Sequence, residues 1–338
     1  MNNTLTVSSS PHITSGESVS RIMLDVILAL IPAGIAAVIF FGWRAALVIG
    51  VSVLSAVAAE AVYQKLMKKP VTIRDFSAVV TGILLAYNLP PTIPLWIVVV
   101  GAVIAIVLVK QIFGGIGHNF MNPALAARAI LLAAWPVEMT TWESPIIDGV
   151  SNATSAATSS ATVDGVSNAT SSATPLAILK SGDGVWADLP PLWDVFVGRI
   201  GGCIGEISAL ALLLGAAYLL IRRVINWRIP ITYIATVGLL TWFFGKDGLF
   251  TGHGLYHIFS GGLILGAFFM ATDYSTSPVT PKGQIIMGIG CGIITTVIRI
   301  LGGYPGGVSY SILIMNVATP LIERYTRPRI YGEVRGNV

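Results

Sequence analysis

Apolar stretches of nearly twenty residues recur along this 338-residue chain and constrain its fold more than any other feature. The first two cover residues 22–43 and 45–66, and each is long enough to cross about 30 Å of hydrocarbon as a helix. Hydrophobic residues make up 54% of the chain and charged residues 11%, whereas soluble domains carry roughly 25% charged residues. The chain therefore predicts an all-α, polytopic membrane protein and argues against a soluble enzyme.

About ten such segments occur, and they divide into two sets of five. The third and eighth segments, residues 75–89 and 257–271, are both short, and the fifth and tenth, residues 122–135 and 308–322, both follow glycine-rich turns. An odd number of crossings per set places the two halves upside down relative to each other. Short, interrupted segments in matching positions predict two inverted five-helix repeats with broken half-helices around a central site. Ordinary short, tilted helices are the alternative. The matching residues are Phe76, Ser77 and Gly82 in the third segment, and Phe259, Ser260 and Gly266 in the eighth.

The segments and the distribution of charge predict five regions and an orientation. Basic residues gather at 65–74, 222–228 and 324–329, which are ends that fall on one side of the membrane. The positive-inside rule then places both termini in the cytoplasm of a cell (inner or plasma) membrane protein. Because the basic residues lie at helix ends and form no stripe, no nucleic-acid partner is expected. The regions are a cytoplasmic segment (1–21), a first membrane repeat (22–136), an extracytoplasmic loop (137–194), a second membrane repeat (195–325) and a cytoplasmic tail (326–338).

The loop contains an internal duplication. Residues 148–154 (DGVSNAT) reappear as residues 164–170, and the second copy continues through a Ser/Thr-rich stretch to Leu176. Its composition is typical of a flexible spacer. Asn152 and Asn168 lie in N-x-T patterns that accept glycans in secreted proteins. From its residues alone, the loop is interpreted as a spacer, with glycosylation left open.

Four ionisable residues fall within or at the ends of apolar segments, where charge is costly and is a functional candidate by default. Asp25 and Glu60 lie in the first two segments, Arg128 in the fifth, and Asp273 at the end of the eighth. Arg128 could neutralise either Asp25 or Glu60 as a buried pair. Each of the four is therefore a candidate either for ion or cofactor handling or for pairing within the fold.

The cysteines and histidines give weak signals. Cys203 and Cys291 lie in apolar contexts, lack CxxC spacing and are too few for an iron–sulfur cluster, so both are expected to be buried and inert. His118 and His257 are the residues that would suggest haem ligation, but no CxxCH motif accompanies them.

Several motifs give the chain a wider resemblance. The loop patterns Asp-Gly-x-Ser-x-Ala-Thr and Ser-x-Ala-Thr-Pro-Leu look like sites at which a flavin transferase esterifies FMN to a threonine. The whole chain resembles the RnfD/NqrB family, the membrane subunits of Rnf and sodium-translocating NADH:quinone oxidoreductase complexes. Residues 280–283 and the absence of a long N-terminal extension favour the RnfD branch. The supporting blocks are residues 10–12, 75–77, 80–82, 117–124, 271–278 and 302–305.

This resemblance implies an electron relay between ferredoxin and NAD or another acceptor, coupled to Na⁺ or H⁺ translocation. It also implies partner subunits that carry iron–sulfur clusters and further flavins, with the chain itself held in membrane lipid. Thr174 is the best candidate for covalent FMN because Pro175-Leu176 follows it directly. Thr170 is the alternative, and Thr154 is third.

The resemblance further implies a non-covalent riboflavin near Asn119 and Asn122, with Asp273 in the matching region of the other half. Amides at a helix N-terminus can hydrogen-bond a flavin edge, but they can equally cap the helix. A stand-alone channel or transporter for a small solute is the alternative function, because inverted repeats with broken helices serve that use as well.

Overall fold

The computed structural model describes most of both predicted repeats and part of the loop between them. Thr154, Thr170, Asn152 and Asn168 lie outside the described residues, so the predictions made on them stay predictions. Within the described part, the fold is helical apart from one short antiparallel pair, β1 (Phe244–Gly245) and β2 (Gly248–Leu249). The described residues are 18–143, 145, 174–181, 189–245, 248–250, 252–302 and 306–327.

The helices follow the ten predicted segments. The first half consists of α1 (Val19–Phe41), α2 (Trp43–Leu66), η1 (Ile73–Asp75), α3 (Ser77–Tyr87), α4 (Leu95–Val103) continuing as η2 (Ile104–Gln111), and α5 (Pro123–Ala134). The second half consists of α9 (Ala209–Ile221), α10 (Arg228–Phe243), α11 (Gly254–Phe259), α12 (Leu263–Leu265) continuing as η5 (Gly266–Met270), α13 (Pro281–Leu301) and α14 (Val308–Thr326). Three short helices lie between the halves: α6 (Pro136–Thr140), α7 (Pro175–Ser181) and α8 (Leu192–Val197).

Length separates the spanning helices from the broken ones. α1, α2 and α13 are long and apolar enough to cross a membrane, whereas α3, α5 and α9 are shorter apolar helices. In α5, Asn122 caps the N-terminus and Pro123 occupies the first position, where its missing N–H costs nothing. α3 ends at Tyr87, just before Pro90 and Pro91. Composition therefore accounts for both the spans and the breaks.

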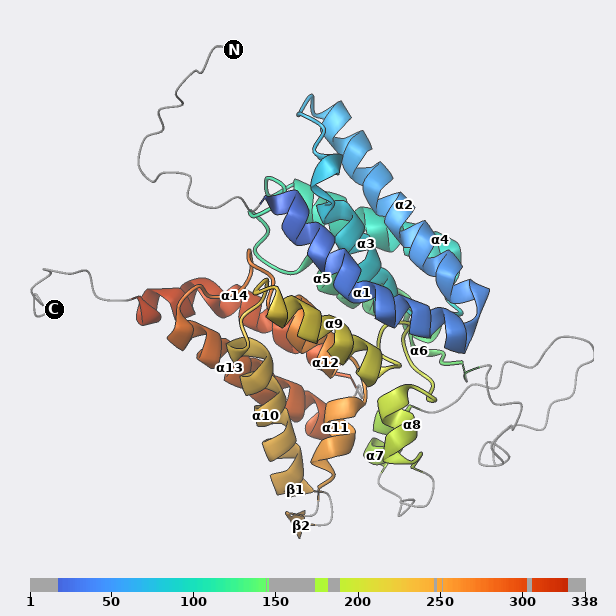
Figure 1. Cartoon of the computed structure of the whole chain (residues 1–338), viewed down its shortest axis with the longest axis vertical. Helices are drawn as coiled ribbons and strands as arrows, with labels where there is room; N and C mark the ends of the chain where they lie inside the picture. Colours follow the sequence, from blue (N-terminus) through green and yellow to red (C-terminus); the bar gives the residue numbers. More distant parts are fainter. Residues whose placement is uncertain are drawn as a thin grey trace, which may run out of the picture.

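The two halves repeat the same packing. In the first, α2 packs against α3 and α4; in the second, α10 packs against α11 and α13. α1 meets α9 and α5 meets α14 where the halves join, and Figure 1 shows the blue-to-green half beside the yellow-to-red half. The predicted fold class, an all-helical polytopic protein in two five-segment halves, is confirmed.

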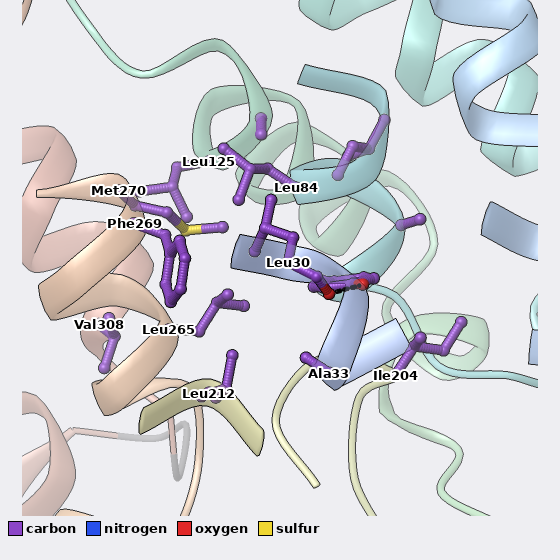
Figure 2. Close-up of a cluster of buried hydrophobic side chains, with 14 of the residues drawn as sticks. Leu30, Ala33, Leu84, Leu125, Ile204, Leu212, Leu265, Phe269, Met270 and Val308 are labelled. Carbon is purple, nitrogen blue, oxygen red and sulfur yellow. Dashed lines mark hydrogen bonds between the residues drawn. The ribbon is translucent and has the colours of Figure 1, made fainter. Parts of the chain in front are cut away.

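A buried apolar cluster joins the halves. Leu30, Leu84 and Leu125 from the first half meet Leu265 and Phe269 from the second, as Figure 2 shows, and all five side chains are at most 6% exposed. The same cluster contains Tyr87, whose hydroxyl donates a hydrogen bond to the carbonyl of Leu30 at 2.7 Å. Packing at native density here fixes how one half sits on the other.

The broken end of α3 obtains backbone partners from the other half. The N–H of Gly205 donates to the carbonyl of Tyr87 at 2.9 Å, and the N–H of Ile204 donates to that of Leu89 at 3.0 Å. Carbonyl groups freed inside a membrane protein must be satisfied by protein. This pairing also explains why the sixth segment becomes helical only at Ala209, after Ser208 caps it, although the apolar run begins at Cys203.

We expect Gly215→Ala to destabilise the protein because α9 lies directly on α1 there. A Cβ at Gly215 would lie 1.9 Å from the carbonyl oxygen of Ala29, and overpacking of this kind costs about 1–3 kcal/mol. Thermal unfolding in detergent measures the change. Gly50→Ala is the matched control, since a Cβ at Gly50 meets nothing within 4 Å. Equal changes in both variants would contradict the close packing.

Candidate functional site

Two cavities lie at opposite ends of α5, and each is lined by both halves. The first, which we call the asparagine cavity, encloses about 810 Å³, part of it open to solvent. It brings together three of the predicted site residues, Asn119, Asn122 and Asp273. Its other polar lining residues are Ser77, Thr81, Lys110, Thr272 and Ser275, and its apolar lining includes Leu84, Phe268 and Phe269.

Asn122 fulfils the capping interpretation. Its Oδ1 accepts hydrogen bonds from the N–H groups of Ala124 at 3.1 Å and Leu125 at 3.2 Å, and its Nδ2 donates to the carbonyl of Met270 at 3.4 Å. The amide therefore caps α5 and contacts the other half. Asn119 has a different role, because its Nδ2 donates to the carbonyl of Met121 at 3.2 Å and it caps no helix.

Asp273 lies in the turn that follows η5. The hydroxyls of Ser275 and Thr276 donate to its Oδ2 at 3.0 and 3.3 Å, so the carboxyl is held by its own loop. The amides of the first half and the carboxyl of the second therefore face one cavity. This arrangement offers a polar-edged ligand both hydrogen-bond donors and acceptors.

Glu60 forms a buried ion pair with a residue that the sequence motifs did not single out. Nζ of Lys110 lies 2.9 and 3.1 Å from the two carboxylate oxygens of Glu60, and Nε2 of Gln111 donates to Oε1 of Glu60 at 2.6 Å. Lys110 also donates to the Ser77 hydroxyl at 2.6 Å. The suggestion that Arg128 neutralises Glu60 is therefore wrong. η2 packs beside α2 and supplies the cation instead.

Asp25 also pairs within the fold, but with the other half. Nη2 of Arg222 lies 3.1 Å from its Oδ2, and the hydroxyl of Tyr218 donates to its Oδ1 at 2.8 Å. Both partners belong to the α9 end that packs against α1. Pairing of Asp25 with Arg128 is excluded, because α9 lies next to α1 and α5 does not supply its partner.

The second cavity, which we call the threonine cavity, encloses about 1090 Å³, part of it open to solvent. Thr174 lines it, and its carbonyl and Oγ accept hydrogen bonds from the N–H of Ala177 at the start of α7. The Oγ contact, at 3.3 Å, uses the oxygen as an acceptor, so replacing the hydroxyl proton would leave it in place. The remaining lining includes Arg128, Glu206, Trp142, Tyr310, Gly261, Gly262, Gly306 and Gly307.

Arg128 connects this cavity to the centre of the molecule. Its Nη1 lies 3.1 Å from Oε1 of Glu206 and 2.7 Å from Oδ1 of Asn88, and its Nη2 lies 3.6 Å from the Cys203 sulfur. Asn88 in turn donates to the sulfur of Met270 at 3.6 Å. Since the Met270 carbonyl accepts from Asn122, a line of polar groups joins the two cavities. Asn88 and Glu206 were not singled out from the sequence, since neither belongs to a recognisable motif.

Both cysteines are buried and free, as predicted. Cys203 is 1% exposed and contacts Arg128, while Cys291 is 0% exposed within α13. In the part of the chain that the structure describes, no group of three or more His, Cys, Asp or Glu side chains is placed to hold a metal ion.

The Glu60–Lys110 pair yields a stability prediction. Lys110→Met leaves the Glu60 carboxylate buried without its cation, and breaking such a pair costs about 3–5 kcal/mol. The double variant Glu60→Gln/Lys110→Met removes both charges, so we expect it to unfold at a temperature between those of the single variant and the unmodified protein. Thermal unfolding in detergent measures the three proteins. A double variant less stable than Lys110→Met would contradict the pairing.

The fold and its cavities define a class: a helical membrane protein of two matching halves whose broken helices surround a ligand-sized cavity at each end of α5. Comparison with known proteins identifies the group within that class. The model of the NQR2, RnfD, RnfE family matches residues 6–332, so the chain belongs to this family.

Three relatives illustrate the similarity, and each is the RnfD-type component of an ion-translocating complex. The chain is 54% identical over 331 residues to the one from the Na⁺-translocating ferredoxin:NAD⁺ oxidoreductase complex of Acetobacterium woodii, covering 97% of this chain and 95% of the relative. It is 45% identical over 334 residues to the one from the proton-translocating ferredoxin:NAD⁺ oxidoreductase complex of Clostridium ljungdahlii, covering 98% of each. It is 37% identical over 350 residues to the one from the ion-translocating oxidoreductase complex of Escherichia fergusonii, covering 98% of this chain and 99% of the relative.

Proposed function

We propose that the chain is the RnfD-type membrane component of an ion-translocating ferredoxin:NAD⁺ oxidoreductase complex and that it relays electrons through flavins. Full-length similarity to the corresponding components of such complexes supports this role over a stand-alone channel. Other subunits of the complex would supply the iron–sulfur clusters and the nucleotide site. The relatives carry both Na⁺ and proton names, so Na⁺ and H⁺ are the two candidates for the ion.

The single observation that carries the flavin proposal is the position of Thr174. Its side chain lines a cavity of about 1090 Å³ shared by the two halves, comparable to the roughly 300–1,000 Å³ of sites that bind drug-sized ligands. Attachment forms a bond between the threonine oxygen and the flavin phosphorus, and the hydroxyl proton leaves. A flavin transferase that uses a phosphoanhydride donor, such as a flavin dinucleotide, would supply the driving force and release the other nucleotide half.

The residues of the threonine cavity suit such a group. Trp142 and Tyr310 offer aromatic surface to a planar ring, and Arg128 places a positive charge in the same cavity. The flavin supplies the redox chemistry when bound, while the protein positions it and tunes its potential. Arg128 would favour the negative charge that a reduced ring acquires, and Glu206 at 3.1 Å would limit that effect.

The asparagine cavity suits a second, non-covalent flavin that lacks the phosphate. The only cation in its lining, among the described residues, is Lys110, and this side chain is paired with Glu60. Asn119 and Asp273 offer hydrogen-bonding groups for the edge of a ring. In this proposal riboflavin occupies the asparagine cavity, and the line from Asn122 to Arg128 separates the two carriers.

The orientation belongs to the proposal as well. With both termini in the cytoplasm, the asparagine cavity faces the cytoplasmic side and the threonine cavity faces the outer side. The basic residues of the ends of α2 and α9, such as Lys65 and Arg222, then lie on the cytoplasmic side, as the positive-inside rule requires. The covalent bond would retain the outer flavin where a free one could diffuse away.

Thr174→Val tests the attachment. We expect the variant, purified from cells that also make the transferase, to lose in-gel flavin fluorescence after denaturation. Its intact mass should equal that of the polypeptide, whereas the unmodified chain should be heavier by FMN minus water. Thr170→Val is the matched control and should retain both signals. Fluorescence that persists in Thr174→Val and vanishes in Thr170→Val would move the site to Thr170.

Asn119→Ala tests the second flavin. Loss of one or two hydrogen bonds should weaken riboflavin binding by roughly five- to tenfold, measured as flavin extracted from the denatured complex and separated by chromatography. Asn122→Ser keeps a capping oxygen at the start of α5 but removes the amide. Unchanged riboflavin in Asn122→Ser would assign Asn122 to capping alone, and unchanged riboflavin in Asn119→Ala would remove Asn119 from the site.

A further inference from the structure

The turn at Gly261 and Gly262 forms a wall of the threonine cavity that only glycine can form. Gly261 has φ +66°, and a Cβ there would lie 2.6 Å from Leu176, two residues after Thr174, and 3.4 Å from Nη2 of Arg299. A Cβ at Gly262 would lie 2.6 Å from Oε1 of Glu206. The backbone of this turn is therefore exposed to the cavity, with the Arg299 guanidinium directly beside it.

Three buried polar atoms around this turn have no partner. Nε of Arg299, Oγ of Ser260 and Nδ1 of His257 make no hydrogen bond. Arg299 is 4% exposed and Ser260 is 0% exposed. The guanidinium donates its other groups to the carbonyls of His257 and Ser260, and among the described residues no carboxylate pairs with it. Buried polar groups are normally satisfied, so the three atoms together indicate a missing ligand.

The matching place in the first half shows what is missing. Lys110 ends the fourth segment there as Arg299 ends the ninth, and Ser77 follows Phe76 as Ser260 follows Phe259. In the first half the cation, the serine and a carboxylate are all bonded together, because Glu60 supplies the anion. The second half repeats the cation and the serine without an anion of its own in the described residues.

The helix ends and the local charges follow the same contrast. The N-terminus of α5 is capped by Asn122, whereas that of α14, which lines the threonine cavity, begins at Gly307 with no side-chain cap. The carboxylate of Glu206 lies against Gly262, but Arg128 at 3.1 Å balances its charge. Arg299 therefore leaves one uncompensated positive charge next to Thr174.

We propose that the turn at Ser260, Gly261 and Gly262, together with Arg299, binds the phosphate of the flavin that Thr174 holds. This inference rests on the proposed function. Backbone N–H groups of successive turn residues and a guanidinium are the groups that bind phosphate oxygens in proteins. The same chemistry explains why the phosphorylated flavin belongs in the threonine cavity and the phosphate-free flavin in the asparagine cavity.

The test uses the purified complex carrying Thr174→Val, which leaves the threonine cavity open to free flavins. Intact mass first shows that the chain carries no flavin, and equilibrium dialysis with equal FMN and riboflavin then gives their binding ratio. We expect FMN to be preferred by roughly tenfold, the size of one charge-assisted hydrogen bond. Adding Arg299→Met should reduce the preference to about one, and Arg299→Lys should keep part of it.

Arg199→Met is the matched control, because this arginine side chain is 49% exposed and pairs loosely with Asp194 at 3.8 Å; it should leave the preference unchanged. If Arg299→Met does not assemble, Ser260→Ala decides instead, and an unchanged preference there overturns the proposal. A preference retained in assembled Arg299→Met, or absent in unflavinylated Thr174→Val, also overturns it while leaving the attachment intact. Flavin still attached to Thr174→Val would overturn both.

Discussion

Every helix that ends inside a membrane leaves backbone groups that water cannot reach, and the structure depends on how these groups are satisfied. The carbonyl of Tyr87 at the end of α3 receives an N–H from Gly205 of the other half. The start of α5 is closed by Asn122, which also reaches Met270 across the interface. The breaks therefore join the two halves, and they lie beside the cavities because open space and free helix ends occur together.

The buried charges form the second layer of this arrangement. Glu60–Lys110 lies within the first half, whereas Asp25–Arg222 and Arg128–Glu206 join the two halves. Such pairs add little net stability compared with apolar packing, but a broken pair is costly. They therefore specify one arrangement of the halves. The charges named as ion-handling candidates from the sequence have structural partners, and the cavities between them supply the space for cofactors.

The sequence was sufficient for the features that depend on local composition. Apolar length predicted the ten segments, and the matching Phe-Ser pairs at 76–77 and 259–260 predicted the repeat. Partner choice was beyond it: Arg128 pairs with Glu206 because of how the halves dock, and no spacing in the sequence encodes that contact. Lys110 was overlooked because it lies at the end of an apolar run, where a lysine normally reaches the interface.

The widened turn of η2 has a consequence for how Glu60 is held. Neighbouring residues on an α-helix point in different directions, yet Lys110 and Gln111 both reach the same carboxylate. The π-helical geometry of Ile104–Gln111 accommodates this at the expense of regular hydrogen bonding, as single π-turns commonly do at functional places. Removing one residue from this stretch would restore an ordinary helix and rotate one of the two donors away, so the acid's environment depends on the local number of residues as much as on their identity.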